Sequence, residues 1–431
     1  MNKKEVEWLY QQLPELVARG VIPAESVELL KNHYGPVTES AGNRTFLVVF
    51  GVIGALLVGL GIILILAHNW AQLTKINRLA IAVGLLLASQ IGAGSVLWFK
   101  RDSLVWREAA ATLLMLMVGA TMAMVGQTYH LVEDTDAFLL TWMVLSLPLM
   151  YLMNSAGVAV MYVVGITFWT GGHSGISKQF IWVLLGVALP YYLNLLKNSR
   201  YANTTVVLSW VVTICLYFCF AAAFSNYLDQ LGLLIYSALF TLAYLVGVLW
   251  FTRPGESWRM PFKTVGLVGS IGLTFVLTFN DIWEHVSSNW QSVPILSYVL
   301  VWGLLGMVIG GNIIVTKRKT LEAKWFSLIP CVIGLAYLVQ FYDSSGTGAT
   351  LILNGYMLWL SISIISAGVR ERSLGIVNLG MVLMAALIVA RFFDIDLSFV
   401  VRGVVFVLIG IGFLVANVVL VRRKAGWQNE K

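Results

Sequence analysis

Apolar residues run along this chain in long stretches, separated by short segments that are polar or charged. A bilayer core needs about 20 mostly apolar residues to be crossed as a helix, and backbone polar groups in hydrocarbon have to pair within that helix. We therefore expect each stretch to be a transmembrane helix. The stretches cover residues 45–67, 79–99, 109–128, 137–153, 156–170, 179–196, 203–224, 230–251, 263–280, 293–315, 325–342, 349–369, 374–393 and 399–421.

Residues 137–170 are apolar almost throughout and leave two interpretations. They form either two short helices with a turn at residues 154–157, or one long helix kinked at Pro148. With the turn, 23 of the 28 Lys and Arg residues fall on the cytoplasmic side, whereas without it fifteen of those 23 move outside. Cytoplasmic loops carry the excess of Lys and Arg in membrane proteins. We therefore predict an all-α polytopic helix bundle of about 14 transmembrane helices, with both termini in the cytoplasm.

Polarity divides the chain into three expected parts. Residues 1–44 form a cytoplasmic helical N-terminal segment, residues 45–421 the transmembrane helical bundle, and residues 422–431 a basic cytoplasmic tail. The N-terminal segment contains no apolar signal core, so no cleavable signal peptide is expected. Gly20 is placed to end a first amphipathic helix and Pro23 to start a second. The segment either caps the inner ends of the helices or docks a cytoplasmic partner.

Composition narrows the class of protein. Hydrophobic residues make up 59% of the chain and charged residues 11%, whereas a soluble domain carries about 25% charged residues. This excludes an ordinary soluble enzyme, a disordered chain and a nucleic-acid-binding protein. The net charge of +7 then reflects the basic cytoplasmic side, and the expected partners are membrane lipids rather than nucleic acid. Three cysteines in apolar stretches suggest neither disulfides nor a cysteine metal site.

The predicted helices contain no ionisable side chain near the bilayer centre, which is where ion paths usually show themselves. The absence of buried carboxylates argues against a proton-coupled carrier. Neutral polar residues within the helices are expected to form interhelical hydrogen bonds, and small residues at packing spacing are expected to bring helices close together. The polar set is Ser89, Gln90, Asn194, Asn312, Asn354 and Asn378; the small residues include Gly119 with Ala123, Gly306 with Gly310, and Gly266 to Gly272.

Ionisable residues gather instead at the predicted outer ends of the helices. Three clusters there form a candidate outer-face site. The first follows the first helix, the second lies between the third and fourth helices, and the third lies where the last two helices meet. Their residues are His68, Asn69 and Trp70; Gln127, Tyr129, His130 and Asp134; and Arg391, Asp394 and Arg402.

Each cluster has a structural alternative. His68 beside Trp70 is also typical of an interfacial anchor, and the acids after His130 are also typical of a solvated loop. Arg391 and Asp394 stand at helical i, i+3 spacing and can pair with each other. If loop acids engage one arginine, the other is free to hold an anion such as a lipid phosphate. No HxxxH or HxH spacing appears, so neither a metal nor a cofactor is expected.

Four motifs carry a resemblance to a known family. They are Arg19-Gly-Val-Ile-Pro-Ala-Glu25 continuing to Tyr34, Ala67-His68-Asn69-Trp70, Gly126-Gln127-Thr128-Tyr129-His130 with Asp134 and Trp142, and Ala390-Arg391-Phe392-Phe393-Asp394 with Arg402-Gly403 and Gly410. As a set, they resemble a widespread bacterial family of predicted polytopic membrane proteins catalogued as a domain of unknown function. The resemblance implies a multi-pass protein of the bacterial cytoplasmic (inner) membrane and brings no activity with it. Residues 157–370 carry no matching motif.

Three functions are compatible with these features. The first is a transporter or flippase for an amphipathic or anionic substrate, for example a lipid-linked envelope precursor, with Arg391 and Arg402 as its anion site. The second is an outer-face membrane enzyme of the polymerase or glycosyl-transfer type, which requires His130 and a carboxylate within hydrogen-bond reach. The third is a non-catalytic sensor or scaffold with the N-terminal segment as its output. Neither the oligomeric state nor the energy source follows from the sequence.

Overall fold

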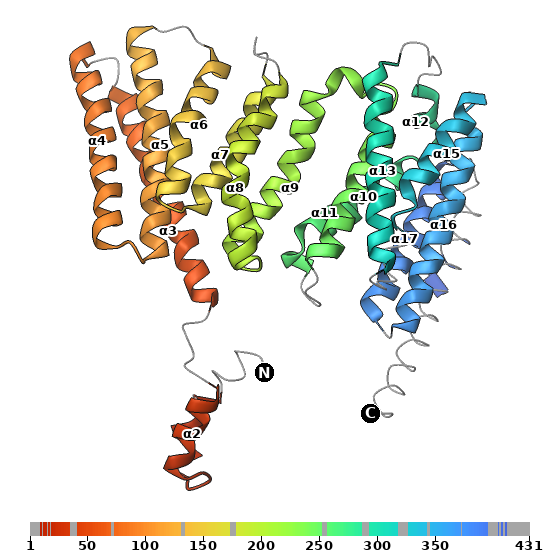
Figure 1. Cartoon of the computed structure of the whole chain (residues 1–431), viewed down its shortest axis with the longest axis horizontal. Coiled ribbons are helices and arrows are strands. Elements are labelled where there is room, and N and C mark those ends of the chain that lie inside the picture. The colour runs from red at the N-terminus through yellow and green to blue at the C-terminus, as the bar shows by residue number, and fades with distance from the viewer. Residues whose placement is uncertain are drawn as a thin grey trace. The chain divides into compact units, whose positions relative to one another are not determined.

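The computed structural model describes residues 9–10, 12–14, 16–17, 19–34, 41–69, 73–130, 134–172, 178–251, 257–286, 293–317, 326–342, 345–371, 373–394, 404, 407 and 410–411. All regular secondary structure in this part of the chain is helical (Figure 1). The α-helices are α2 (Ala24–Tyr34), α3 (Ala41–Asn69), α4 (Lys75–Phe99), α5 (Leu104–Tyr129), α6 (Thr135–Leu152), α7 (Ala156–Gly171), α8 (Ile181–Ser199), α9 (Asn203–Ala223), α10 (Gly232–Trp250), α11 (Pro261–Val276), α12 (Asn280–His285), α13 (Ile295–Lys317), α15 (Ile329–Tyr342), α16 (Thr347–Arg370) and α17 (Leu374–Asp394).

The apolar stretches of the sequence correspond to these helices. Within the described residues, nine helices are long and apolar enough to cross a membrane, and four further apolar helices are shorter. The all-α class is confirmed, and thirteen of the fourteen predicted stretches coincide with a helix. The fourteenth stretch, 399–421, lies largely outside the described residues, so the total of fourteen and the placement of both termini stay predictions.

The doubtful join at residues 137–170 is a turn between two helices. Ser155 accepts a hydrogen bond of 3.2 Å from the N–H of Val158 through its hydroxyl and thereby caps the start of α7. Asn154 adopts a left-handed conformation (φ 46°) that reverses the chain direction. The two helices run antiparallel, because Gly165 in α7 packs against the side chain of Met143 in α6. Pro148 lies inside α6 and does not end it.

The chain divides into two compact units. The first comprises residues 1–175 and 184–208, and the second comprises residues 176–183 and 209–431. In the first unit α5 is central, because it packs against α3, α4, α6 and α7; α4, α5 and α6 stand side by side in Figure 1. In the second unit α10 packs against α11, α13 and α15, and α16 packs against α15 and α17.

Close packing at small residues is confirmed at some of the predicted positions. A Cβ atom at Gly119 would lie 2.4 Å from the Trp142 ring, and one at Gly266 would lie 2.3 Å from the backbone N of Tyr244. Gly306 and Gly310 have open space instead, so the expectation of a close helix contact there is wrong within the described residues. Glycine therefore brings α5 against α6 and α11 against α10, whereas in α13 it is the adjacent Gly311 that packs against a neighbouring helix, at Leu245 of α10.

Two expectations about polar positions are corrected by the helices themselves. The hydroxyl of Ser89 bonds to Leu86 O, and Asn194 accepts a bond from Asn198, so both stay within their own helices. Asn354 of α16 makes the expected bond to another segment, at Thr278 O.

The predicted stretch 263–280 is not one helix. α11 ends at Val276, and the short helix α12 begins at Asn280.

Candidate functional site

The structure describes part of the predicted outer-face site. His68 and Asn69 lie at the end of α3 and Asp394 at the end of α17, but their side chains fall outside the description. Trp70 and Arg402 lie wholly outside it. The clusters around His68 and His130 belong to the first unit, and the cluster around Arg391 belongs to the second. Each is therefore described within its own unit, and their convergence in one site stays a prediction.

The His130 motif ends α5. His130 adopts a left-handed conformation (φ 50°), and its backbone N–H donates to Gly126 O, which closes the last turn of the helix. Gln127, Tyr129 and His130 are all exposed, whereas Thr128 is buried and bonds through its hydroxyl to Met124 O. Among the described residues, the imidazole of His130 makes no hydrogen bond or ion pair. This cluster shapes a helix end and presents three polar side chains.

Asp134 begins the next helix. Its Oδ1 accepts hydrogen bonds from the backbone N–H groups of Asp136 (3.0 Å) and Ala137 (3.1 Å), which is the usual role of an N-cap aspartate. The capping bonds supply a structural function for Asp134, and the described contacts place no carboxylate within hydrogen-bond distance of His130. The enzyme hypothesis required such a pair.

Trp142 of the same motif is a packing residue. Its indole N–H donates a bond of 2.8 Å to Met115 O in α5, and its ring lies against Gly119. A hydrogen bond to a backbone carbonyl from a partly buried indole is typical of a tryptophan that fixes the spacing of two helices. Trp142 therefore joins α6 to α5 at a position where only glycine leaves enough room.

The second unit contains a break between α11 and α12, at residues 277–279. Carbonyl groups freed at this break are bonded by side chains from other positions. Trp283 Nε1 donates to Leu277 O (2.8 Å), and Asn354 Nδ2 donates to Thr278 O (3.0 Å). Within α12, Trp283 O accepts both from the N–H of Val286 and from Gln340 Nε2 (3.1 Å). Unpaired backbone groups are costly in an apolar environment, so Trp283 and Asn354 stabilise the non-helical conformation of residues 277–279.

Arg391 reaches this break from α17. Its guanidinium group donates to Thr278 Oγ1 (3.4 Å) and lies over the Phe279 ring, 4.6 Å from the ring centroid. The side chain is half-buried. A guanidinium stacked on an aromatic ring is held in one orientation, and its planar fork of donors matches the geometry of an anion such as phosphate. The side chain of Asp394 lies outside the described part of the structure, so its pairing with Arg391 stays a prediction.

Polar side chains continue from the break toward the surface. Thr350 Oγ1 donates to Asn280 Oδ1 (3.3 Å), and Asn280 Nδ2 donates to Glu284 Oε1 (2.8 Å). Asn280 and Thr350 are half-buried, and Glu284 is exposed. We call Thr278, Asn280, Glu284, Thr350, Asn354 and Arg391 the break cluster. It combines one cation, one exposed acid and several neutral hydrogen-bonding groups at a single end of the second unit.

Glu108 was missed by sequence reasoning. Its side chain is only 2% exposed, so the expectation that the helices contain no buried carboxylate is wrong at this position. The carboxylate accepts bonds from the N–H groups of Ala156 (2.8 Å) and Gly157 (2.9 Å) and from the Ser155 hydroxyl. It lies in the first turns of α5, beside Arg107 in a polar stretch of sequence, which made it look like a loop residue.

Further buried polar atoms lie close to Glu108. Thr112 Oγ1 faces Gly157, where an added Cβ would lie 3.2 Å away, and the Tyr191 hydroxyl is within electrostatic range of Glu108 and Arg107. The hydroxyls of Thr112 and Tyr191 and the Nε of Arg107 have no hydrogen-bond partner among the described residues. Buried hydroxyls of this kind are often bridged by water. The group forms a polar centre where α5, α7 and α8 meet.

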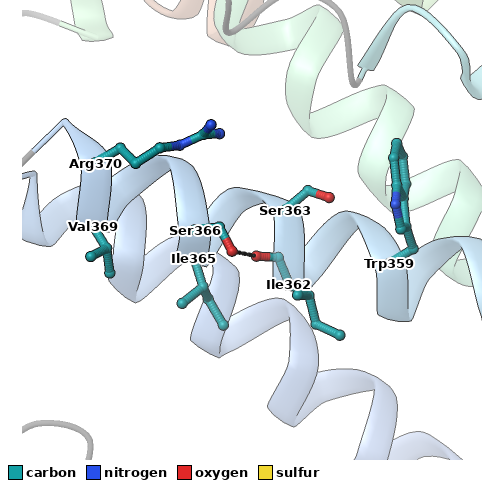
Figure 2. Close-up of a pocket in the computed structure, with 7 residues that line it drawn as sticks. All are labelled: Trp359, Ile362, Ser363, Ile365, Ser366, Val369 and Arg370. Atoms are coloured by element: carbon teal, nitrogen blue, oxygen red, sulfur yellow. Dashed lines mark hydrogen bonds between the residues drawn. The ribbon is translucent and has the colours of Figure 1, made fainter.

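The described part of the chain offers neither a metal site nor a deep ligand pocket at the predicted site residues. No group of three or more His, Cys, Asp or Glu side chains there is placed to hold a metal ion. A hollow of about 520 Å³ lies on α16, and Figure 2 shows that its seven lining residues all come from that helix. The hydroxyl of Ser366 within it bonds to Ile362 O of the same helix. None of the predicted site residues lines it.

Residues 14–159 match the family described as "Predicted membrane protein (DUF2157)". No curated protein and no solved structure matches the chain. The match includes the motifs around His68 and His130 and ends at the start of α7, while the Arg391 motif lies beyond it. The resemblance to a membrane protein family of unknown function is thereby confirmed over this part of the chain. With its apolar helices, the chain is a membrane protein similar, over residues 14–159, to that predicted membrane protein family.

Proposed function

We propose that the protein is a transporter or flippase of the bacterial inner membrane for an amphipathic anion, with lipid-linked envelope precursors as the substrate class. One observation carries this proposal: Arg391 is held at a helix break of the apolar bundle by Thr278 and Phe279. Arginines within membrane helices are costly and usually mark a substrate path. Discontinuous helices also commonly form the binding sites of transporters.

The carrier is favoured over the enzyme by the described contacts. A base for glycosyl or phosphoryl transfer has to lie within hydrogen-bond reach of its partner groups. Asp134 is engaged in capping α6, and His130 ends α5 as an exposed residue. The break cluster, by contrast, offers a cation and neutral hydrogen-bonding groups, which bind an anionic head without acting on it.

Transport can be tested in vesicles reconstituted with the full-length chain. Phosphatidylglycerol labelled on its acyl chain with a fluorophore serves as the probe, and membrane-impermeant dithionite bleaches only molecules in the outer leaflet. With the wild type, we expect dithionite to bleach a larger fraction of the fluorescence than the outer leaflet alone contains. With Arg391→Gln, we expect the bleached fraction to equal that of protein-free vesicles. Bleaching in wild-type vesicles that equals that of protein-free vesicles would refute transport of this lipid class.

Arg370→Gln is the matched control. Arg370 is an exposed arginine at the end of α16, away from the break cluster, so its loss removes one positive charge without touching the proposed anion site. Equal loss of transport in both variants would show that net charge, and not the position of Arg391, is responsible.

A further inference from the structure

Asn354 has an unused acceptor in the middle of the break cluster. Its Nδ2 donates to Thr278 O (3.0 Å) and to Thr350 O (2.8 Å), which uses both N–H donors of the amide. Its Oδ1 is buried and has no hydrogen-bond partner among the described residues. A buried acceptor without a donor is unfavourable, because it has lost its water and gained nothing in exchange.

The orientation of the amide is fixed by its neighbours. Exchanging the nitrogen and oxygen atoms would place Oδ1 against two carbonyl oxygens, Thr278 O and Thr350 O, neither of which can donate. The unfilled position is therefore an acceptor, and only a donor satisfies it.

Arg391 and Asn354 both bond to Thr278. The Arg391 guanidinium donates to Thr278 Oγ1 while Asn354 bonds Thr278 O, so a cationic group and an unfilled acceptor flank one threonine. Both Arg391 and Asn354 are half-buried, and the cluster reaches the surface through the exposed Glu284. A ligand that uses both groups needs a negative charge and, close to it, a hydrogen-bond donor.

We infer that the break cluster recognises a phosphate ester that carries a hydroxyl group, with Arg391 binding the phosphate and Asn354 Oδ1 accepting from the hydroxyl. This rests on the proposed function, for which it names the head chemistry and makes Asn354 a specificity-determining residue. Because Oδ1 has no exposed surface, a ligand reaches it only as neighbouring side chains move, as they do when a carrier changes conformation. The hydroxyl is the feature that separates this class from other anionic amphiphiles.

Two lipids of equal charge test the inference. Phosphatidylglycerol carries hydroxyls on its head, whereas phosphatidylmethanol carries the same phosphate charge and none. The full-length protein in neutral detergent is unfolded by heat at increasing concentrations of each lipid. We expect half-maximal stabilisation of the wild type at an about tenfold lower concentration of phosphatidylglycerol, which corresponds to about 1.4 kcal/mol.

The variants assign that difference to residues. Asn354→Leu should make the two lipids equivalent, and Arg391→Gln should weaken both. Asn312→Leu, which replaces a half-buried asparagine of α13, should preserve the wild-type preference. Equal stabilisation of the wild type by both lipids overturns the inference even if Asn354→Leu does not fold, and it is the result expected if a buried water fills the acceptor.

A third probe identifies the source of the head group. Glycerol phosphate has the same phosphate and hydroxyls without acyl chains. Stabilisation by glycerol phosphate that depends on Asn354 indicates a soluble ester, whereas no such stabilisation indicates a lipid.

The experiments distinguish failure of this inference from failure of the proposed transport. If stabilisation depends on Asn354 but dithionite bleaching equals that of protein-free vesicles, the binding site is supported and transport is refuted. If transport depends on Arg391 but both lipids are transported at equal rates, only the preference for a hydroxyl group is refuted.

Discussion

Glu108 on α5 accepts a hydrogen bond of 2.9 Å from the backbone N–H of Gly157 on α7. The first N–H groups of a helix have no partner within that helix and carry a partial positive charge. A carboxylate from a neighbouring helix therefore stabilises the start of α7, together with the local cap from Ser155. These bonds join the turn between α6 and α7 to the first turns of α5. The central helix of the first unit thereby positions the α6–α7 hairpin.

Glu108→Gln should destabilise the protein. Hydrogen bonds to a charged group contribute about 1.5–3 kcal/mol each, and glutamine replaces one acceptor oxygen by an NH₂ group that faces other donors. We expect a loss of about 2 kcal/mol or more, measured by thermal unfolding in detergent. Asp102→Asn is the control, because Asp102 is an exposed acid in the turn before α5. An unfolding midpoint equal to that of Asp102→Asn would show that the three bonds contribute nothing net.

Gly266→Ala should destabilise the second unit. The new methyl group would lie 2.3 Å from Tyr244 N and 2.6 Å from Phe240 O, which are backbone atoms that can yield only if α10 moves away from α11. Overpacking of this kind costs about 1–3 kcal/mol. Gly272→Ala in the same helix meets nothing within 4 Å and should leave the unfolding midpoint unchanged or raise it, because alanine favours a helix over glycine. The prediction fails if the two variants unfold at the same temperature.

The helices could be predicted because their signal is local. A stretch of apolar residues has one solution in a bilayer, and the charge distribution correctly selected two helices over residues 137–170. Helix ends were predicted within about five residues, but the stretch 263–280 was predicted as one continuous helix, whereas α11 ends at Val276 and α12 begins at Asn280. That break is held by Trp283 and Asn354, and nothing within the stretch itself, 263–280, indicates it.

The candidate site shows the same limit. Arg391 was identified from sequence because an arginine near the end of an apolar helix is conspicuous, but its contacts Thr278 and Phe279 lie far away along the chain. Glu108 was missed because its partners at positions 155–157 are 47 to 49 residues away and two of them are backbone N–H groups, which no residue type reveals. Long-range hydrogen bonds to the backbone are therefore what sequence reasoning lacked.

The predicted sidedness can be tested at the two ends of α5. Asp102 and Asp134 are both exposed and flank this 26-residue helix, so they should lie on opposite sides of the membrane. In a Cys331→Ser background, which removes the exposed native thiol, we expect Asp134→Cys to react with a membrane-impermeant maleimide in intact cells. Asp102→Cys should react only after permeabilisation. The opposite pattern would invert the topology, and labelling of both in intact cells would contradict α5 as a transmembrane helix.

Trp283→Phe should weaken the break between α11 and α12. Trp283 is fully buried, and its indole N–H bonds Leu277 O; phenylalanine keeps most of the packing but leaves that carbonyl without its donor. An unsatisfied buried acceptor costs about 1–3 kcal/mol, which thermal unfolding in detergent would detect. Trp302→Phe is the control, because Trp302 on α13 is 72% exposed, and its unfolding midpoint should equal that of the wild type. Arg391 contacts Thr278 and Phe279, which lie next to Leu277. Trp283→Phe should therefore also reduce transport of phosphatidylglycerol, measured as dithionite bleaching above that of protein-free vesicles. Normal transport at a lowered unfolding midpoint would separate the stability of the break from the anion site.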